Sequence, residues 1–151
     1  MYEDRKGVVN FLGRVESLRR RIKARVLDNT RNFMVKLGNE SEDGALVVVE
    51  GPRDVQALRS LGFKGKTHML CWNSGLSKLP AEMAKFRKVI PLLDLDREGK
   101  ALTKKIMGAA ERNGVKIDMY YWRQIIPVTE GSITEIQELI KFSDGNPSAT
   151  M

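Results

Sequence analysis

The chain has 151 residues, of which 42% are hydrophobic and 30% are charged, with a net charge of +7 at pH 7. This length and composition predict one folded domain with a real core and exclude a mainly disordered or collagen-like chain. The longest apolar run, Ala45–Val49, is too short to cross a membrane, and a single cysteine excludes an internal disulfide, so we expect a reduced, cytoplasmic protein with no membrane partner.

The first predicted element is a helical arm that, with its closing loop, covers residues 1–43. Apolar residues recur there at steps of three and four, which is typical of a helix with one apolar stripe. The stripe consists of Val8, Phe11, Leu12, Val15, Leu18, Ile22, Val26, Phe33 and Leu37. Residues 28–30 favour helix caps over helix interiors, so the pattern leaves open one helix or two. The polar segment 38–44, bounded by glycines, predicts a loop before the main domain.

The arm is also basic, since residues 1–39 carry a net charge of +6. We expect its basic face to lie opposite the apolar stripe. That face is predicted to include Arg19, Arg20, Lys23 and Arg25. A basic surface of this kind indicates a polyanionic partner such as a nucleic acid, whereas the apolar stripe favours docking onto the domain or onto a second copy in a homodimer.

Strands and helices alternate in the main domain, predicted over residues 44–142. The expected strands cover residues 46–49, 67–71, 89–93 and 116–122, and the expected helices cover 52–61, 79–85, 98–113 and 132–142. Alternation predicts an α/β fold with a mostly parallel, four-stranded sheet flanked by helices. Pro91 cannot donate a ladder hydrogen bond, so it predicts an edge strand or a late strand start. The polar tail, 143–151, is expected to be flexible.

Acidic residues follow two of the predicted strands. Glu50 ends the first strand, with Asp54 close behind it, and Asp94 and Asp96 end the third. Ligands of parallel α/β sheets bind beyond the carboxyl ends of the strands, so these carboxylates are expected to converge. Clustered carboxylates stay ionised only when a cation joins them, and their hard oxygen atoms suit Mg²⁺, with Mn²⁺ as a substitute.

These two acidic segments carry a resemblance to a known family. Residues 47–54, Val-Val-Val-Glu-Gly-Pro-Arg-Asp, and residues 94–99, Asp-Leu-Asp-Arg-Glu-Gly, resemble the strand–Glu–Gly and Asp-x-Asp signatures of the Toprim domain. That domain is shared by topoisomerases, bacterial-type primases, OLD-family nucleases and small nucleases that mature ribosomal RNA. The resemblance covers roughly residues 45–122, includes a Gly-containing turn at 73–75, and implies a Rossmann-like fold.

The resemblance also implies a role for each matching residue. Asp94 and Asp96 would hold the metal ion, and Glu50 would be a metal ligand or the general acid or base. Asp54 matches a position that is acidic in only some members, which leaves its role open. Backbone positions at the site would be Gly51, Gly75 and Gly99, and phosphate contacts would come from Arg53, Arg97 and Lys100.

Two functions follow as hypotheses. The first is a stand-alone Mg²⁺-dependent nuclease acting on RNA or DNA, with RNA favoured by the small size and the basic arm. The second is a non-catalytic nucleic-acid-binding or ribonucleoprotein module that retains a metal site. Three other residues are predicted to be structural: Cys71 as a buried strand end, His68 as a strand residue, and Trp72 as a packing residue more than a base-stacking one.

Overall fold

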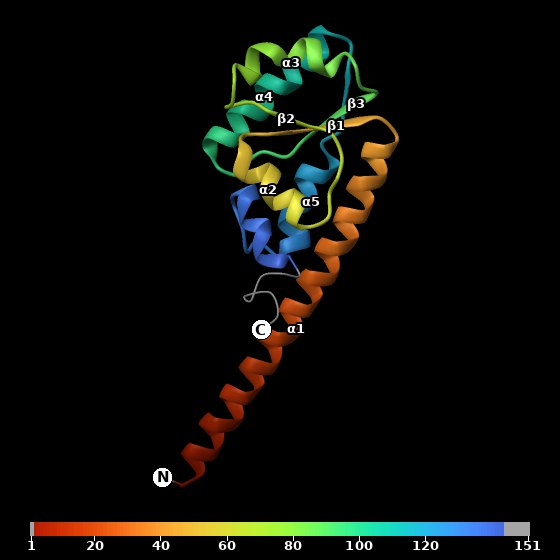
Figure 1. The fold of residues 1–151 in the computed structure, drawn as a ribbon. Coiled ribbons are helices and arrows are strands. Elements are labelled where there is room, and N and C mark those ends of the chain that lie inside the picture. The colour runs from red at the N-terminus through yellow and green to blue at the C-terminus, as the bar shows by residue number, and fades with distance from the viewer. Residues whose placement is uncertain (1, 144–151) are drawn as a thin grey trace.

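The computed structural model describes residues 2–143, so all but the first residue of the predicted flexible tail lies outside the described part (Figure 1). The elements in chain order are α1 (Tyr2–Glu42), β1 (Ala45–Val49), α2 (Pro52–Ser60), β2 (Thr67–Met69), α3 (Gly75–Met83), β3 (Lys88–Pro91), α4 (Arg97–Arg112), β4 (Lys116–Ile117), α5 (Tyr120–Thr129) and the 3-10 helix η1 (Ile136–Phe142).

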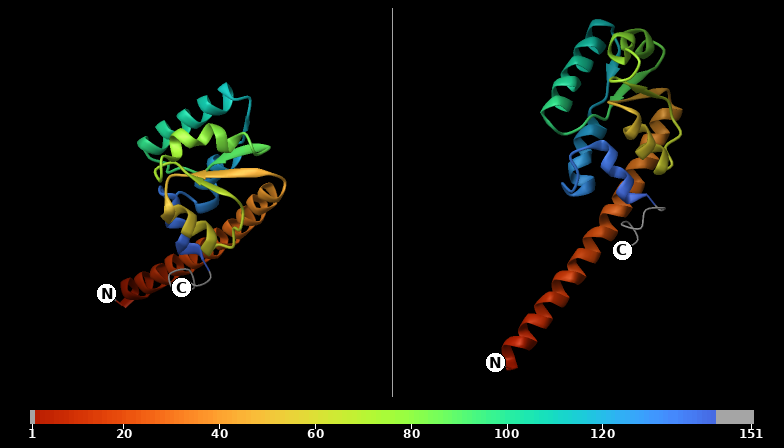
Figure 2. Two further views of the ribbon diagram at one scale, coloured as in Figure 1. Left: turned by 45° about the horizontal axis from the view of Figure 1, so that its top comes forward. Right: turned by 60° about the vertical axis from the view of Figure 1, so that its left-hand side comes forward.

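The four strands form one parallel sheet, as the sequence predicts, and their order in the sheet is β2-β1-β3-β4. Helices cover both faces of this sheet (Figure 2). β1 is buried along its whole length, and its side chains alternate between two cores. Val47 and Val49 pack with α1, α2, α5 and η1, whereas Leu46 and Val48 pack with α3 and α4. The fold is therefore the predicted α/β sandwich.

The N-terminal arm is one continuous helix. The prediction of a loop over residues 38–44 is wrong, because α1 continues to Glu42. Thr30, which was a candidate break, is fully buried and donates its hydroxyl to the carbonyl of Val26 at 2.7 Å, so it fits inside the helix. Phe33 and Leu37 are buried in the same core as β1. Tertiary packing of this part of α1 therefore overrides the local preference of its polar residues.

The C-terminal part also departs from the prediction. The strand expected over 116–122 ends at Ile117, because the Asp118 carboxylate accepts the backbone N–H of Tyr120 at 3.0 Å and α5 begins there. Tyr121 then packs edge-on against Phe33, with ring centroids 5.5 Å apart. The helix expected over 132–142 is instead the shorter 3-10 helix η1.

Pro91 does not mark an edge strand, since β3 lies between β1 and β4. It is the last residue of β3 and pairs with Val48 of β1. On the other side β4 pairs only with Lys88 and Val89. The hydrogen-bond ladder between β3 and β4 therefore ends before Pro91, so the missing N–H of the proline does not interrupt it. No helix within residues 2–143 combines the length and apolar character needed to cross a membrane.

A buried lysine connects α1 to the sheet. Lys88 is only 6% exposed, and its ammonium group pairs with Glu40 of α1 and, at 2.9 Å, with Asp118 after β4. Two carboxylates thus share one cation between three elements. Removing one partner of a buried ion pair leaves the remaining charges buried without a counter-charge. The stability lost in this way is far greater than that lost with an exposed pair.

We expect Lys88→Met to lower the free energy of unfolding by about 3 kcal/mol, because Met fills the same space without the charge that Glu40 and Asp118 require. Urea denaturation measures this change. The matched control is Lys85→Met, which removes an exposed lysine paired with Glu82 and is expected to cost less than about 1 kcal/mol. Equal losses in the two variants would contradict the prediction.

Candidate functional site

Two acidic residues meet where neighbouring strands end. Glu50 directly follows β1, and Asp94 lies three residues beyond the end of β3, the strand paired with β1. Their side chains lie close enough that Asp94 raises the pKa of Glu50, in addition to the larger effect of burial. They line an open cleft of about 530 Å³, whose walls are Glu50, Gly51, Pro52, Arg53, Asp54, Cys71, Asp94, Glu135 and Gln137.

Glu50 is the most perturbed acid of this cleft. Burial raises its pKa from 4.5 to about 8, with further contributions from the hydrogen bond to Asp94 and from the negative charges of Asp94, Asp54 and Asp96. Without a cation, Glu50 therefore carries a proton at neutral pH. A carboxyl group with a pKa near the working pH can both donate and accept a proton.

Backbone amides hold two further acids of the cleft, Asp94 and Asp54, in place. The Asp94 carboxylate accepts the N–H of Ile136 at 2.8 Å, which joins the end of β3 to the start of η1. Asp54 is 6% exposed and accepts the N–H of Gly51 at 3.0 Å. Burial raises the pKa of Asp54, although hydrogen bonds from the backbone oppose this change.

Asp96 also caps a helix, in addition to its predicted role as a metal ligand. It is the N-cap of α4, and one of its carboxylate oxygens accepts the N–H of Gly99 at 2.7 Å. A Cβ at Gly99 would lie 1.9 Å from the carbonyl oxygen of Asp94, so glycine allows α4 to start against the acidic segment. Gly75 similarly packs on the carbonyl of Met69, whereas a Cβ at Gly51 would meet open space.

We expect Gly99→Ala to lower the free energy of unfolding by about 2 to 3 kcal/mol, because the new methyl group would push α4 away from the backbone of Asp94. Thermal or urea denaturation measures the loss. Gly38→Ala is the matched control, since a Cβ there meets nothing within 4 Å inside α1 and helical Gly→Ala changes stabilise by about 0.5 to 1 kcal/mol. A Gly99→Ala protein as stable as the parent would contradict this packing argument.

The donor set has the chemistry of a magnesium site. Glu50 holds a proton beside Asp94 at neutral pH, and a divalent cation would neutralise the same pair of carboxylates in its place. As the side chains stand, no three carboxylate, thiol or imidazole groups within residues 2–143 converge closely enough to surround one ion. Each carboxylate has two oxygens, so Asp96 retains one oxygen beyond its capping bond.

The predicted basic residues divide into two groups. Arg53 lines the cleft, and Arg97 and Lys100 are exposed in the first turns of α4. The four arm residues predicted to contact nucleic acid lie on α1, outside the lining of the cleft; they are Arg19, Arg20, Lys23 and Arg25.

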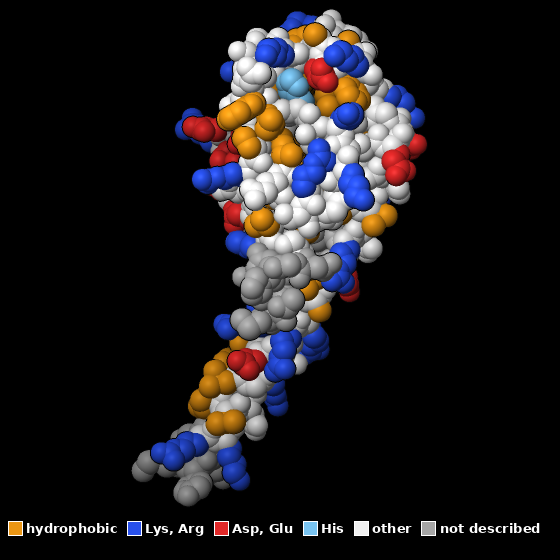
Figure 3. Space-filling model, in the orientation of Figure 1, with side chains coloured by type: hydrophobic (Ala, Val, Ile, Leu, Met, Phe, Trp, Pro, Cys, Tyr) orange, Lys and Arg blue, Asp and Glu red, His pale blue; other side chains and the backbone are white. Residues whose placement is uncertain are grey.

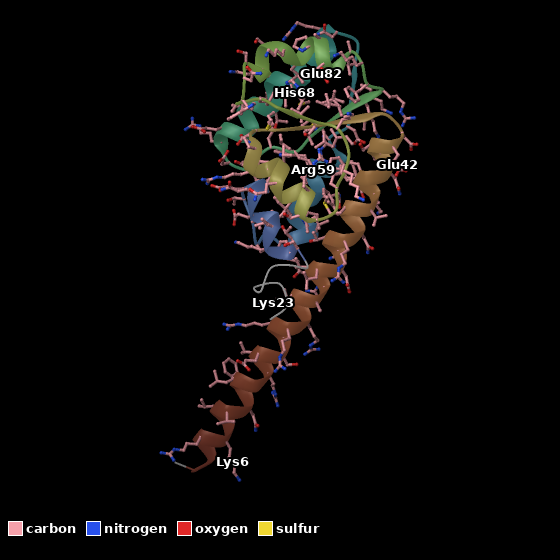
Figure 4. The ribbon with its side chains drawn as sticks, viewed as in Figure 1. Lys6, Lys23, Glu42, Arg59, His68 and Glu82 are labelled. Carbon is pink, nitrogen blue, oxygen red and sulfur yellow. The ribbon has the colours of Figure 1, made fainter. Side chains whose placement is uncertain are left out.

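The predicted separation of basic and apolar faces on α1 is wrong in part. Lys23 lines one pocket together with Ile22 and Val26, and Lys23 and Val26, three positions apart, share a helix face. Arg25 is not free for a partner, since it donates to Glu130 at 2.8 Å. Lys23 extends from the part of α1 that projects beyond the sheet (Figure 4).

Sequence reasoning missed the contribution of the C-terminal segment. Glu135 and Gln137 line the cleft, and Ile136 supplies the amide that binds Asp94 across 42 positions of sequence. No local pattern signals this contact. Cys71 was predicted to be a buried strand end, but it lies beyond β2, which ends at Met69, and it is exposed at the wall of the cleft.

His68 and Trp72, which precede and follow Cys71 in the sequence, differ in their surroundings. His68, in β2, lies 2.6 Å from the carbonyl of Gly75 through its Nε2 atom, which suits a structural role. Trp72 was predicted to be a packing residue, yet 57% of it is exposed. It lies in a turn whose next two residues, Asn73 and Ser74, have left-handed backbone conformations.

Comparison with known proteins identifies the same region. The Toprim domain family matches residues 44–120. A UPF0292 protein of Pyrococcus abyssi is 34% identical over 119 residues, which are 76% of this chain and 78% of that protein. A UPF0292 protein of Archaeoglobus fulgidus is 33% identical, over 71% of this chain and 83% of its own. A solved structure of a putative protein from Aquifex aeolicus has a TM-score of 0.61 and 25% identity, covering 71% of this chain and 94% of that one.

Proposed function

The chain belongs to the Toprim domain family, and on that premise we propose that it is a Mg²⁺-dependent enzyme that hydrolyses phosphodiester bonds in nucleic acid, with RNA favoured over DNA. Toprim domains generally bind Mg²⁺ and are associated with nucleic acids. The observation that carries the proposal is the meeting of Glu50 and Asp94 in the cleft, where burial first, and then Asp94 and the other nearby acids, raise the pKa of Glu50 to about 8. Strongly perturbed acids in a cleft are typical of catalytic sites.

Within this proposal the acids have separate tasks. Asp94 and Asp96, with Glu50 or Asp54, would hold a divalent cation, which neutralises charge on the phosphate when it is bound. Glu50 would move the proton of the attacking or leaving oxygen, since it holds a proton at neutral pH without a cation and gives that proton up when a cation binds. Arg53 lines the cleft, and Arg97 and Lys100 lie on α4; in this proposal the three would hold phosphate oxygens of the substrate.

One observation favours a second function, a nucleic-acid-binding module without catalysis. No three metal-binding side chains within residues 2–143 surround a common point as they stand. A site that must rearrange to hold an ion could be a vestige. The acids themselves are nevertheless all present, which supports catalysis over the module.

A cleavage assay separates the two functions. The full chain is incubated with labelled single-stranded and duplex RNA and DNA at pH 8, with Mg²⁺, with Mn²⁺ or with EDTA. Metal-dependent products that EDTA abolishes would support the nuclease. Binding of the same substrates without products in either metal would instead favour the module, and neither binding nor cleavage would contradict both.

The arm is proposed to add phosphate contacts in either function. If Arg19, Arg20 and Lys23 each neutralise one phosphate, replacing all three by Gln should reduce the slope of log affinity against log salt by roughly two to three units. Titration of labelled RNA and DNA at several KCl concentrations measures the slope. An unchanged slope would assign nucleic-acid contact to the cleft and α4 alone, and unchanged Mn²⁺ binding serves as the control for folding.

A further inference from the structure

The N-terminal half of α1 carries apolar side chains that nothing in the described chain covers. Phe11 is 65% exposed, Val8 57%, Leu12 55% and Leu18 52%. This half of the helix projects away from the rest of the fold (Figure 1), and hydrophobic side chains gather along one side of it (Figure 3). Apolar patches of several hundred Å² on a folded chain usually mark an interaction surface.

The spacing of this stripe is that of a coiled coil. The stripe runs through Val8, Phe11, Val15, Leu18 and Ile22, with alternating steps of three and four. This is the a/d pattern by which two helices interlock along a seam. The same face of α1 is buried from Val26 onward, where it packs on the domain. The helix therefore has one apolar face, of which the far half lacks a partner within the described residues.

We propose that this far half pairs with the same segment of a second copy of the chain, antiparallel and centred on Val15. The exposed residues of the stripe, with Leu12 beside it, are 52–65% exposed, which at roughly 150 to 200 Å² per side chain is on the order of 400 Å² per chain. Two copies would bury about 800 Å² of apolar surface, to which the stems of the flanking arginines add, and this is the size of a weak, reversible interface.

Charge selects the antiparallel arrangement. In a parallel pair with this register, Arg14 of each copy would lie beside Arg19 of the other, which places like charges together twice. In the antiparallel pair centred on Val15, Arg19 faces Leu12 and can lay its aliphatic stem on it. Only Arg14 then meets its own counterpart across the symmetry axis.

A pocket at the base of the arm fits the same arrangement. It measures about 440 Å³, and its lining includes Ile22, Val26, Leu27 and Phe142. In the antiparallel pair Val8 of one copy lies opposite Ile22 of the other, so the tip of each arm ends at this pocket. The pair would thus cover both the exposed stripe and the apolar wall that follows it.

The first test is the mass of the full chain in solution, by sedimentation and light scattering at micromolar concentration without nucleic acid. We expect a dimer that Leu18→Glu weakens at least about a hundredfold, because it places a charge in the seam of both copies. Ser17→Glu adds the same charge one residue away on the exposed opposite face and should leave the dimer unchanged. A monomer at all concentrations, or equal effects of the two variants, would overturn the proposal.

Salt gives an independent test. The arm is strongly basic, so KCl should screen the repulsion between copies and tighten the dimer several-fold between 0.1 and 0.5 M. An acidic protein partner on the same stripe would be released by salt, and recovery of such a complex in place of the dimer would overturn the proposal. Far-UV circular dichroism of each variant confirms that α1 remains helical.

The orientation is tested by disulfide formation in a Cys71→Ser background. A mixture of Val8→Cys and Ile22→Cys chains should form the mixed disulfide, because those positions face each other in the antiparallel pair. Val8→Cys alone should remain unlinked. Efficient linkage of Val8→Cys to itself would instead demonstrate parallel arms and overturn the arrangement.

Discussion

Replacing Glu50 by Gln is expected to reduce nucleic-acid cleavage at least about a hundredfold, with a much smaller loss of substrate affinity. Gln preserves the size of the side chain and can hydrogen-bond to Asp94, but it cannot exchange a proton with the reacting oxygen. The proposed function makes this residue the proton carrier because burial and its acidic neighbours raise its pKa to about 8. Single-turnover kinetics with saturating enzyme separates this loss from any change in binding.

The control for this experiment is Glu111→Gln, which removes an exposed carboxylate from α4 outside the cleft lining. Its turnover should equal that of the parent. If Glu50→Gln retains parental turnover, Glu50 has no part in the chemistry, and its contact with Asp94 serves only to hold a metal ion or the fold.

Divalent metal affinity is expected to rise about tenfold per pH unit between pH 6 and 8 and to level off above pH 8. A cation must displace the proton that Glu50 holds below its pKa of about 8, so each ion bound in this range releases about one proton. Calorimetry with Mn²⁺ in buffers of different ionisation enthalpy measures both the affinity and the proton release. Glu50→Gln should bind Mn²⁺ with almost no dependence on pH across this range.

The same proton affects stability without metal. Because the pKa of Glu50 in the folded protein lies above its ordinary value of 4.5, the folded state holds the proton more tightly than the unfolded state. The stability associated with this proton is therefore complete below about pH 4.5 and is lost as the pH rises through 8. Allowing for partial exposure to solvent, we expect a loss of about 1 to 3 kcal/mol in the parent and almost none in Glu50→Gln.

The variant Asp94→Asn tests whether Asp94 is a ligand of the divalent cation. Asn can still accept the N–H of Ile136, so the join between β3 and η1 is preserved. The lost charge should weaken Mn²⁺ binding at least about tenfold and lower the pKa of Glu50, because two of the causes that raise it come from Asp94. Equal Mn²⁺ affinity in Asp94→Asn and the parent would contradict a metal site at this edge of the sheet.

Much of the fold and the place of the acidic site could be predicted from the sequence. β1 is a run of apolar residues buried on both faces, and such a run is typical of a central parallel strand. Glu50 and Asp94 follow two hydrophobic strands, and neighbouring parallel strands end at the same edge of the sheet. Their meeting therefore depends only on local patterns and on a general rule of topology.

Contacts between distant segments could not be predicted in this way. The amide of Ile136 on Asp94, the pairing of Lys88 with Glu40 and the packing of Tyr121 on Phe33 each join residues that no local pattern relates. These contacts extend α1 through its polar residues, pack the start of α5 against α1, and bring Glu135 to the cleft. Local propensity amounts to less than about 1 kcal/mol per residue, which burial of a large side chain outweighs.

The two halves of α1 illustrate this division most directly. Their spacing of apolar residues is alike, and it correctly predicts a helix with one apolar face. The tertiary structure decides that Phe33 and Leu37 are buried in the core whereas Phe11 and Leu18 are exposed. The periodicity indicates only that one face of the helix is apolar. What covers that face depends on which other elements the fold brings against it, and the sheet and its helices reach only the second half of α1.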